Sequence, residues 1–521
     1  MKYTMYFAGL IACFFSIVAV QAQENKFLNS PARKLQLAEF AIANLYVDEV
    51  NEGKLVEEAI VKMLEQLDPH STYSDPEEVK KMNEPLQGNF EGIGIQFNMA
   101  EDTLLVIQPV SGGPSEKAGI LAGDRIVMVE DTLIAGVKMS TEDIMRRLRG
   151  PKDSKVNLKI LRRGVKELLP FTVKRDKIPV YSLDASYMIK DKIGYIRINR
   201  FAATTHEEFK KALAELQKKG MKDLILDLQG NGGGYLNAAI DIANEFLGKK
   251  ELIVYTEGRR NPRSEFFAKG TGEFQNGRLI VLVDEFSASA SEIVTGAVQD
   301  WDRGVVVGRR SFGKGLVQRP IDLPDGSMIR LTVARYYVPS GRSIQKPYDE
   351  GKEKYYTDIY QRLLHGEFSQ KDSIHFDEKL KYQTVGGRTV YGGGGIMPDL
   401  FVPGDTVGFS RYLVEVNRKN QYLYDFTFDF MDRHRQETKN IKDYKQLLKY
   451  LDRFDLVNEM ADYAAAKGLK RDEKGIRDSY DVLNSLIKAF IGRHVLDDDG
   501  FYPILYQNDV TIKKAIEAQG T

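Results

Sequence analysis

The sequence predicts a multidomain α/β protein, and three of its features lead to that prediction. The chain has 521 residues, several times the length of one compact domain. From Ile193 to Val307, short apolar runs alternate with segments of helical periodicity, which is typical of a layered core with parallel strands. The two ends of the chain show helical periodicity alone, so we expect helical segments to flank this core.

Changes of pattern along the chain give the expected domain boundaries. They predict a signal peptide over residues 1–22, an N-terminal helical domain over 23–87, a small β domain over 88–175, the α/β core over 176–346 and 386–405, a polar insertion over 347–385 and a helical C-terminal domain over 406–521. Within the core we expect strands at residues 193–198, 223–228, 279–283 and 305–307, and helices at 207–218, 236–247 and 289–298.

The overall charge of the chain is balanced. Its 74 Lys and Arg residues offset 74 Asp and Glu residues, and the pI is near 7.0. Such a charge provides no global attraction to nucleic acid or to an anionic membrane, so nucleic acid is not an expected partner. Hydrophobic residues make up 42% of the chain, which is enough for a sizeable core and excludes wholesale disorder.

The first 22 residues have the pattern of a secretory signal peptide. Lys2 precedes an apolar run over residues 5–20, and small residues lead to Ala22, after which the chain is polar. The run is shorter than the about 20 residues of a membrane span, although an uncleaved anchor stays an alternative. We therefore expect export to the bacterial periplasm or cell envelope, with cleavage after about Ala22.

Cys13, the only cysteine of the chain, lies inside this segment. Residues 10–13 also resemble a bacterial lipobox, in which Cys13 would be lipidated. We favour this less, because an apolar stretch would then begin the mature chain. A cleaved chain would have no cysteine, so thiol catalysis, disulfides and cysteine metal sites are not expected.

The small β domain carries glycine-containing motifs in a fixed order. Gly92-Ile93-Gly94-Ile95 comes first, Ser115-Glu116-Lys117-Ala118-Gly119-Ile120 follows, and Gly123-Asp124-Arg125-Ile126 comes last. This series resembles a PDZ domain. The resemblance implies that a peptide adds as a strand to a sheet edge and that backbone N–H groups of residues 92–95 bind its C-terminal carboxylate. The alternative is an unrelated β domain whose glycines only shape turns.

Two strand-to-helix junctions of the core carry residues suited to catalysis. In the first, a strand leads into Gly230-Asn231-Gly232-Gly233-Gly234, where a flexible backbone can expose N–H groups to an anion. Tyr235 replaces the last Gly of a dinucleotide-binding pattern, so that site is not expected. In the second, a strand leads to Ser287-Ala288-Ser289-Ala290-Ser291-Glu292. These serines either cap a buried helix or provide an acyl-transfer nucleophile.

A third segment contains a lysine between two glycines. Residues 308–314 have the G-x-x-x-x-G-K pattern of a phosphate-binding loop, but Gly315 stands where a Ser or Thr would bind Mg²⁺. ATP binding is therefore not expected. Lys314 is then either a solvated loop lysine or an amine brought close to a serine of the second junction.

These motifs together resemble the carboxyl-terminal processing proteases, also called tail-specific proteases. The resemblance rests on Asp-Leu-Gln-Gly-Asn-Gly-Gly-Gly at 227–234, Ser-Ala-Ser-Ala-Ser-Glu at 287–292, Ser-Phe-Gly-Lys-Gly-Leu-Val-Gln at 311–318 and the PDZ-like series upstream. It extends from about Leu35 to Pro403. It implies a ClpP/crotonase-like protease core with an inserted PDZ domain, and serine endopeptidase activity.

The same resemblance implies roles for individual residues. By its position in the motifs, Ser289 matches the nucleophile, Lys314 the general base and Gln318 the residue that orients the lysine. The backbone N–H groups of Gly233 and Ala290 match the oxyanion hole. Gln229 and Gly232 stand where many members have Arg and Pro, which leaves the shape of the first junction open.

The chemistry of a lysine base sets two requirements. A free lysine has a pKa near 10.4, so fewer than about one in a thousand is neutral at pH 7. Lys314 must therefore be desolvated, and lowering its pKa by about 3 units costs the charged form roughly 4 kcal/mol. Four residues of extended chain span about 13 Å, so the chain must bend near Gly313 or Gly315 for Lys314 to meet Gln318.

A Ser-His-Asp triad is the alternative chemistry. The six histidines all lie away from the strand-to-helix junctions of the core, and the G-x-S-x-G pattern is absent from the sequence. They are His70, His206, His365, His375, His434 and His494. His206 lacks the second histidine of a zinc helix, and no metal or organic cofactor is implied.

Three functions are compatible with these observations. The first is an exported serine endopeptidase that binds protein substrates by a free, apolar C-terminus and cleaves them upstream. The second is a catalytically silent PDZ scaffold that binds protein C-termini, and the third is crotonase-like acyl-CoA chemistry, which export disfavours because the CoA pool is cytoplasmic. The helical C-terminal domain is a candidate surface for an adaptor protein or for homo-oligomerisation.

Overall fold

The computed structural model describes residues 30–100, 102–405, 408–418 and 421–519. The expected signal peptide and Cys13 lie outside these residues. The described helices include none with the length and apolarity to cross a membrane. The chain forms two compact units, of which the smaller contains residues up to Pro76 together with Gln318–Thr332, and the larger contains Glu77–Val317 and Val333–Thr521.

The smaller unit combines helices with a β-hairpin from much later in the chain. Ser30 and Asn51 cap the two helices, because each side chain accepts the N–H of the residue three positions on. The following short strand pairs antiparallel with the second strand of the hairpin. The elements are α2 (Pro31–Leu45), α3 (Glu52–Glu65) and β1 (Thr72–Ser74), together with the parts of β17 (Leu316–Asp322) and β18 (Met328–Tyr337) that lie within Gln318–Thr332. The helices agree with the expected pattern, whereas β1 lies in a segment expected to be helical only.

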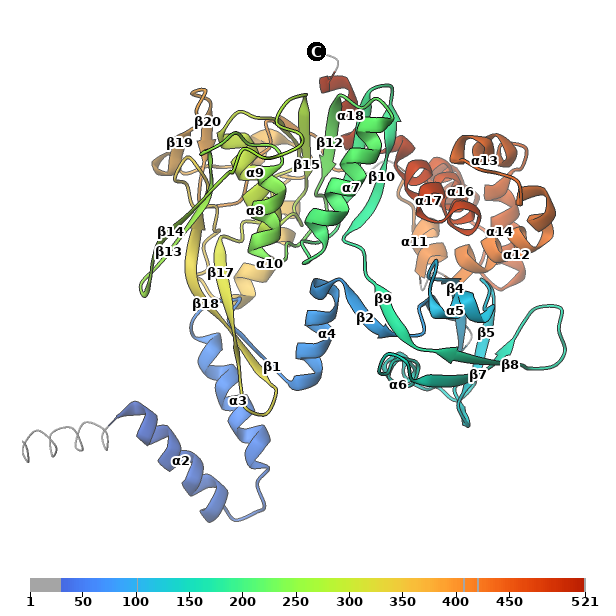
Figure 1. Cartoon of the computed structure of the whole chain (residues 1–521), viewed down its shortest axis with the longest axis horizontal. Coiled ribbons are helices and arrows are strands. Elements are labelled where there is room, and N and C mark those ends of the chain that lie inside the picture. Colours follow the sequence, from blue (N-terminus) through green and yellow to red (C-terminus); the bar gives the residue numbers. More distant parts are fainter. Residues whose placement is uncertain (1–29, 101, 406–407, 419–420, 520–521) are drawn as a thin grey trace, which may run out of the picture. The chain divides into compact units, whose positions relative to one another are not determined.

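A six-stranded sheet forms the centre of the larger unit (Figure 1). Its order is β10-β11-β12-β15-β16-β21, and all neighbours are parallel except β10 and β11. The strands are β10 (Leu183–Lys190), β11 (Ile193–Ile198), β12 (Asp223–Asp227), β15 (Leu279–Val283), β16 (Val305–Gly308) and β21 (Leu400–Phe401). The predicted parallel α/β core is confirmed, and β10 and β21 are the strands that the sequence did not predict.

Alternate residues of the central strands point to two separate hydrophobic cores. In β15, Leu279, Val281 and Val283 pack with the three core helices, whereas Ile280 and Leu282 face the opposite core. The helices are α7 (Thr205–Lys218), α8 (Leu236–Asn244) and α9 (Ala290–Asp300). Because both faces are covered, β15 is apolar throughout, as expected of a buried parallel strand.

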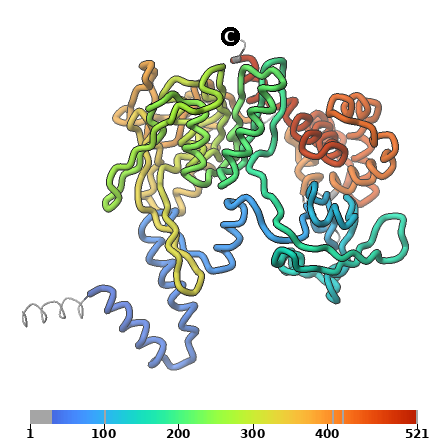
Figure 2. Tube along the Cα trace, in the orientation of Figure 1, coloured from blue at the N-terminus to red at the C-terminus, as the bar shows by residue number. Residues whose placement is uncertain are grey.

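The end of the chain covers the second face of this sheet. Ile512 and Ala515 of α18 (Val510–Gln519) are buried against Ile280 and Leu282 of β15. Figure 2 shows the red C-terminal segment returning to the green strands of the core. The last helix of the chain is therefore part of the packing of the central sheet.

The small β domain has its own core and sheet. The strand order is β3-β4-β5-β7-β8, so β3 forms one end of the sheet, and β6 pairs with β5. The elements are β3 (Ile95–Ala100), β4 (Thr103–Pro109), α5 (Pro114–Ala118), β5 (Arg125–Val129), β6 (Thr132–Leu133), α6 (Thr141–Leu148), β7 (Lys155–Leu161) and β8 (Leu169–Lys174). Helix α4 (Pro76–Gln87) precedes the domain, and the segments that enter and leave it pair with each other as β2 (Asn89–Gly92) and β9 (Asp176–Pro179).

Helices make up most of the remaining elements. The insertion contains α10 (Lys352–Leu364) and two 3-10 turns, and the hairpins β13 (Leu252–Gly258) with β14 (Asn261–Phe267) and β19 (Lys381–Gln383) with β20 (Thr389–Tyr391) complete the larger unit. The C-terminal region contains α11 (Arg411–Asn417), α12 (Gln421–Thr438), α13 (Tyr444–Leu451), α14 (Leu456–Ala466), α15 (Glu473–Asp478), α16 (Tyr480–Leu496) and α17 (Asp498–Leu505). This region is helical, as the sequence predicts.

Packing of α18 on the sheet leads to a prediction for stability. Ile512→Ala should lower the free energy of unfolding of the core by about 2–5 kcal/mol, because the side chain is 2% exposed and its removal leaves a cavity. Val510→Ala in the same helix is the control, since Val510 is 38% exposed. Urea midpoints of the two variants should differ clearly, and equal midpoints would contradict the assigned packing.

Candidate active site

Ser289 lies at the N-terminus of the buried helix α9, in a strained backbone conformation. Its φ is 56° and its ψ is −111°, a region that non-glycine residues rarely occupy. The N–H of Ser289 donates to Oε2 of Glu292 at 2.8 Å, which holds this conformation. Ser289 is half-buried between the buried residues Ala288 and Ala290.

The other two serines of this motif have structural bonds. The hydroxyl of Ser287 donates to the carbonyl of Leu228 at 2.8 Å, and the hydroxyl of Ser291 donates to the carbonyl of Asn231 at 2.9 Å. Both serines are buried, and both bonds join the two strand-to-helix junctions. Of the three serines in the motif, Ser289 is therefore the candidate nucleophile.

The glycines of the first junction allow it to approach Ser289 closely. Gly233 has a φ of 101°, and a Cβ atom at this position would lie 2.8 Å from Cβ of Ser289 and 3.0 Å from the backbone nitrogen of Ala290. A larger residue cannot be placed there without displacing Ser289 or its neighbours. The N–H of Ala288 donates to the carbonyl of Asn231 at 2.9 Å and completes the contact between the junctions.

The two expected oxyanion donors differ in their present partners. The N–H of Ala290 belongs to the first turn of α9, where the helix has no carbonyl of its own to accept it. The N–H of Gly233 donates to Oδ1 of Asn231 at 2.9 Å. Gly233 must therefore exchange this acceptor for a substrate oxygen if it is to act as the second donor.

Arg197 of β11 stabilises the first junction, at residues 227–234, by hydrogen bonds. Its guanidinium donates to the buried carboxylate of Asp227 at 2.6 Å and to the carbonyl of Gln229 at 2.8 Å. The N–H of Gly230 also donates to Asp284 at 2.9 Å, and burial raises the pKa of Asp284. The shape of the junction, which the sequence left open at Gln229 and Gly232, is thus held by Arg197 of β11 and by Asp284, which follows β15.

Every backbone polar group of residues 313–315 has a hydrogen-bond partner. The N–H groups of Gly313 and Lys314 donate to Glu292 at 2.7 and 2.9 Å, and that of Gly315 donates to Oε1 of Gln345 at 2.8 Å. The carbonyl of Gly313 accepts the N–H of Lys346 at 3.0 Å. The carbonyl of Lys314 accepts the hydroxyl of Tyr336 at 2.6 Å, and the carbonyl of Gly315 accepts the N–H of Tyr336 at 2.9 Å. The segment bends at Gly313, whose φ is 89°. Lys314 therefore has a fixed backbone and a half-buried side chain.

Glu292 joins the two candidate catalytic residues. Its carboxylate accepts the N–H groups of Ser289, Gly313 and Lys314 and the hydroxyl of Ser311, the last at 2.5 Å. The side chain is fully buried, and burial raises its pKa, while the four hydrogen bonds oppose this rise. In the sequence, Glu292 stands out only as the end of the Ser-Ala-Ser-Ala-Ser-Glu motif. Its position as the third residue of α9 is the local signal for its bond to Ser289.

Tyr336 adds a second connection between the same two residues. Its hydroxyl donates to the carbonyl of Lys314 at 2.6 Å and lies 3.1 Å from the carbonyl of Ser289. Burial raises the pKa of Tyr336 well above its usual value, so the hydroxyl stays protonated and able to donate. This residue belongs to no motif, so the sequence contained no signal for it.

The polar insertion at residues 347–385 binds the segment that precedes Lys314. Arg362 of α10 is buried and donates to the carbonyls of Arg310 and Ser311 at 2.6 and 3.1 Å. Glu367 accepts hydrogen bonds from both Arg310 and Arg362. The insertion, whose role the sequence did not indicate, thus holds the start of the segment that carries Lys314.

Gln318 is located in the smaller unit, on strand β17. Its side-chain N–H donates to the hydroxyl of Thr332 on β18 at 3.3 Å. The Thr332 hydroxyl in turn donates to the carboxylate of Asp68 at 3.0 Å. The side chain of Gln318 is therefore bound by Thr332 of β18, which in turn is bound by Asp68 of the N-terminal segment.

The expected carboxylate-binding loop lies at the edge of the small β domain. Its residues Gly92, Ile93, Gly94 and Ile95 join β2 to β3, the strand at one end of the sheet. The N–H and the hydroxyl of Ser115 both donate to the carbonyl of Ile93, at 3.0 and 2.7 Å. Gly94 has a φ of 71°. The loop is thus anchored beside an edge strand to which a peptide can add.

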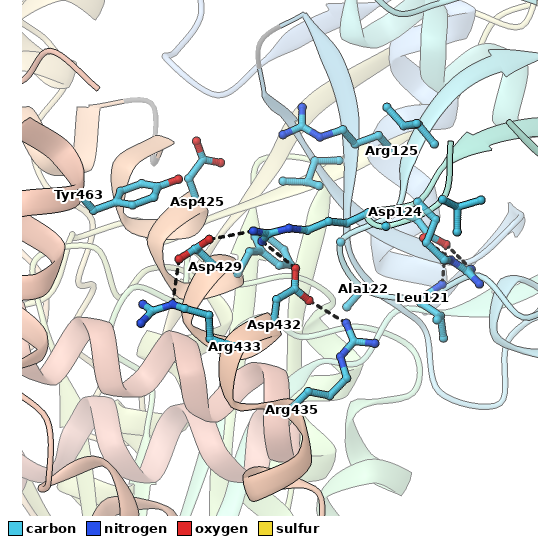
Figure 3. Close-up of a pocket in the computed structure, with 18 of the residues that line it drawn as sticks. Leu121, Ala122, Asp124, Arg125, Asp425, Asp429, Asp432, Arg433, Arg435 and Tyr463 are labelled. Atoms are coloured by element: carbon cyan, nitrogen blue, oxygen red, sulfur yellow. Dashed lines mark hydrogen bonds and ion pairs between the residues drawn. The ribbon is translucent and has the colours of Figure 1, made fainter. Parts of the chain in front are cut away.

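A cavity of about 840 Å³ lies away from these candidate residues, between the small β domain and helices α12 and α14 (Figure 3). Arg163 donates to Asp429 at 3.1 Å and to Asp432 at 2.9 Å across it. Arg433 and Arg435 pair with the same two carboxylates. The acidic side chains of the cavity are therefore neutralised by nearby arginines.

Glu292 leads to a prediction about activity. Glu292→Gln should lower kcat about 10- to 100-fold, because the amide NH₂ of glutamine would face N–H donors that now bind a carboxylate oxygen. Glu245→Gln is the control, since Glu245 is also buried but binds His206 and the N–H of Glu273, outside both junctions. Steady-state kinetics on an unfolded polypeptide should show the loss in the first variant alone. A Glu292→Gln enzyme with normal kcat would contradict the assigned role.

Four segments of the chain match models of known families. Residues 192–351 match peptidase family S41, 92–174 match the PDZ domain, 16–78 match the N-terminal domain of the activating protease CtpB, and 412–497 match a family of unknown function.

Relatives of known activity are similar to most of the chain. The carboxy-terminal-processing protease of Bartonella bacilliformis is 38% identical over 336 residues, which are 63% of this chain and 76% of the relative. The carboxy-terminal processing protease CtpB of Bacillus subtilis is 36% identical over 332 residues, 63% of this chain and 68% of the relative. Among solved structures, the photosystem II D1 C-terminal processing protease is 28% identical with a TM-score of 0.38, and the match covers 73% of this chain and 88% of that one.

Proposed function

The chain belongs to the carboxy-terminal processing proteases of peptidase family S41 and is a serine-type peptidase with a PDZ domain, and from this premise we propose a specific mechanism and mode of recognition. Ser289 and Lys314 form the catalytic dyad of an exported endopeptidase. The PDZ domain binds the free C-terminus of a protein substrate, which is then cleaved upstream.

In the proposed reaction, Lys314 is the general base. Its neutral amine takes the proton of the Ser289 hydroxyl while the oxygen attacks the carbonyl carbon of the scissile peptide bond. The protonated amine then gives the proton to the leaving nitrogen, and an acyl-enzyme remains. Water then attacks the ester while the same amine takes its proton. The amine gives this proton to the oxygen of Ser289 as the ester bond breaks, so the product acid leaves and the free hydroxyl and neutral amine are restored.

One observation supports this dyad most strongly. The carboxylate of Glu292 accepts the backbone N–H groups of both Ser289 and Lys314, at 2.8 and 2.9 Å. Two residues that are 25 positions apart in the sequence are therefore held on one buried side chain. This shared acceptor supports the dyad, because it brings the backbones of the two residues together on one carboxylate.

Stabilisation of the tetrahedral intermediate is assigned to the helix N-terminus. The N–H of Ala290 is the first proposed donor, and the positive end of the α9 dipole favours a negative charge there. Gly233 is the second, after its N–H leaves Asn231. Gln318 is proposed to accept a hydrogen bond from the amine of Lys314 through its amide oxygen and so to direct the amine.

The dyad is tested by removing each functional group. Ser289→Ala and Lys314→Ala should each reduce kcat on the order of 10⁴-fold or more while the urea midpoint stays unchanged. Ser264→Ala and Lys269→Ala remove a serine and a loop lysine elsewhere in the same unit and should retain activity. Substantial turnover by a purified Ser289 or Lys314 variant would refute the dyad.

Recognition of a free C-terminus is the second part of the proposal. The edge strand β3 and the anchored loop at residues 92–95 support it, because a peptide that extends the sheet at this edge places its carboxylate at the loop. Tethering in this way raises the local concentration of the scissile segment near Ser289. Export is supported by the pattern of residues 1–22, and an adaptor or a second copy of the chain stays a prediction from the sequence.

The recognition step predicts a preference between two substrates. An unfolded polypeptide with a free apolar C-terminus should be cleaved with a kcat/KM about tenfold or more above that of its C-terminally amidated twin, since the amide lacks the charge that the loop N–H groups bind. Equal rates would remove C-terminal recognition from the proposal but leave the dyad intact. Binding without cleavage would favour a silent PDZ scaffold.

A further inference from the structure

The side chain of Arg197 contacts both the first junction and a tyrosine from the end of the chain. Its guanidinium donates to the carboxylate of Asp227 at 2.6 Å and to the carbonyl of Gln229 at 2.8 Å. The carbon of the same guanidinium lies over the ring of Tyr506, 5.3 Å from the ring centre. Tyr506 begins a 3-10 turn, Tyr506–Asn508, that precedes α18, and all of these residues belong to the larger unit. A residue from the C-terminal end of the chain therefore reaches the cation that binds the first junction.

The contact between Arg197 and Tyr506 is largely shielded from water. The side chain of Arg197 is 16% exposed, and Tyr506 is half-buried. A cation over the face of an aromatic ring is attracted by the negative charge of that face, and the attraction increases when water is excluded. The ring of Tyr506 also lies 6.3 Å from the ring of Tyr195, whose hydroxyl donates to Asp227 at 2.5 Å. Tyr506 therefore contacts two side chains that bind the carboxylate of Asp227.

Arg197 helps to determine the course of the first junction at Gln229. The N–H of Gln229 donates to Oδ1 of Asp227 at 2.8 Å, while its carbonyl accepts from Arg197. The backbone then turns at Gly230, whose φ is 72°. A Cβ atom at Gly230 would lie 3.7 Å from Nη2 of Arg197, so the guanidinium is within contact range of this turn. Both backbone polar groups of Gln229 are thus fixed by one buried pair of charges.

The proposed oxyanion donor Gly233 follows four positions after Gln229. Asn231 lies between them in the chain, and its side chain accepts the N–H of Gly233 and donates to the carbonyl of Ile198, both at 2.9 Å. A tetrahedral intermediate needs its donor within about 3 Å of the oxygen, so a small shift of the junction weakens the stabilisation. The position of Gln229 therefore bears on how well Gly233 can stabilise the oxyanion.

We propose that Tyr506 is a positioning residue of the peptidase, which acts through Arg197 to hold the first junction where the N–H of Gly233 reaches the oxyanion. The inference rests on the proposed role of Gly233 in the oxyanion hole. It assigns a part in catalysis to a residue outside both the 192–351 segment that matches the peptidase family and the 412–497 segment that matches a family of unknown function. The aromatic face, and not the hydroxyl, is the group that has this role.

The direct test removes the ring of Tyr506. Tyr506→Leu keeps an apolar side chain in the core but loses the aromatic face, so kcat should fall about three- to tenfold. KM should stay unchanged, because the oxyanion donors stabilise the intermediate rather than the bound substrate. Tyr506→Phe keeps the face and should retain kcat within about twofold. Steady-state kinetics on the free-C-terminus polypeptide measure both variants, and equal kcat values for them would overturn the inference.

A control in the same core separates positioning from loss of packing. Tyr506 and Ile512 both pack in the core on the second face of the sheet. Ile512→Ala should lower the stability of this core but leave the contact between Tyr506 and Arg197 in place. Assayed well below its unfolding temperature, this variant should keep the kcat of the unsubstituted enzyme. A fall of kcat like that of Tyr506→Leu would overturn the inference, since loss of packing alone would then account for it.

A double-mutant cycle shows whether the effect passes through Arg197. Arg197→Lys keeps a positive charge for Asp227 but loses the fork that binds Asp227 and Gln229 together, so its kcat should fall at least as far as that of Tyr506→Leu. Adding Tyr506→Leu to it should cause no further loss of kcat. A further loss as large as in the single variant would overturn the inference, because Tyr506 would then act by another route.

The same measurements distinguish a failure of this inference from a failure of the proposed dyad. A normal kcat in Arg197→Lys, with Ser289→Ala inactive, would refute the role of Tyr506 and leave the dyad standing. An active Ser289→Ala enzyme would refute the dyad and this inference together.

Discussion

The buried carboxylate of Glu292 is the interaction on which the candidate site depends. A charge in a protein interior is strongly unfavourable unless hydrogen bonds replace its water, and here four donors do so. Those donors come from both the turn at Ser289 and the segment at residues 311–314. Folding of each segment is therefore favourable only when the other is in place, and this couples the stability of the core to the geometry of the site.

The backbone around Lys314 is also held rigidly by hydrogen bonds. All six backbone polar groups of residues 313–315 are bonded, and the insertion holds the residues just before them through Arg362. Ser289 keeps a positive φ in the same surroundings. Groups that are fixed before the substrate arrives need little reorganisation during the reaction, which is the usual source of catalytic advantage in such sites.

The central sheet also depends on a segment outside residues 192–351, which match the peptidase family. Its second face is covered by α18, which follows the region of unknown function, and Arg197 on that sheet holds the carbonyl of Gln229. The N-terminal turn at Asp68 likewise holds Thr332 of the late hairpin. Helix α18 thus stabilises the central sheet of the larger unit, and the N-terminal turn stabilises the hairpin within the smaller unit.

The local features of this protein can be read from its amino-acid sequence. Strands β11 and β15 are predicted with their observed bounds, because runs of mostly apolar residues indicate burial directly. The motifs around Ser289 and Lys314 are recognisable because the residues of each motif are close together in the sequence. In contrast, the fold is needed to see that Glu292 and Tyr336 join those motifs, that β1 pairs with β18 and that α18 covers the sheet. Such contacts link residues up to hundreds of positions apart, and no local periodicity records which distant partner satisfies a buried polar group or an apolar face.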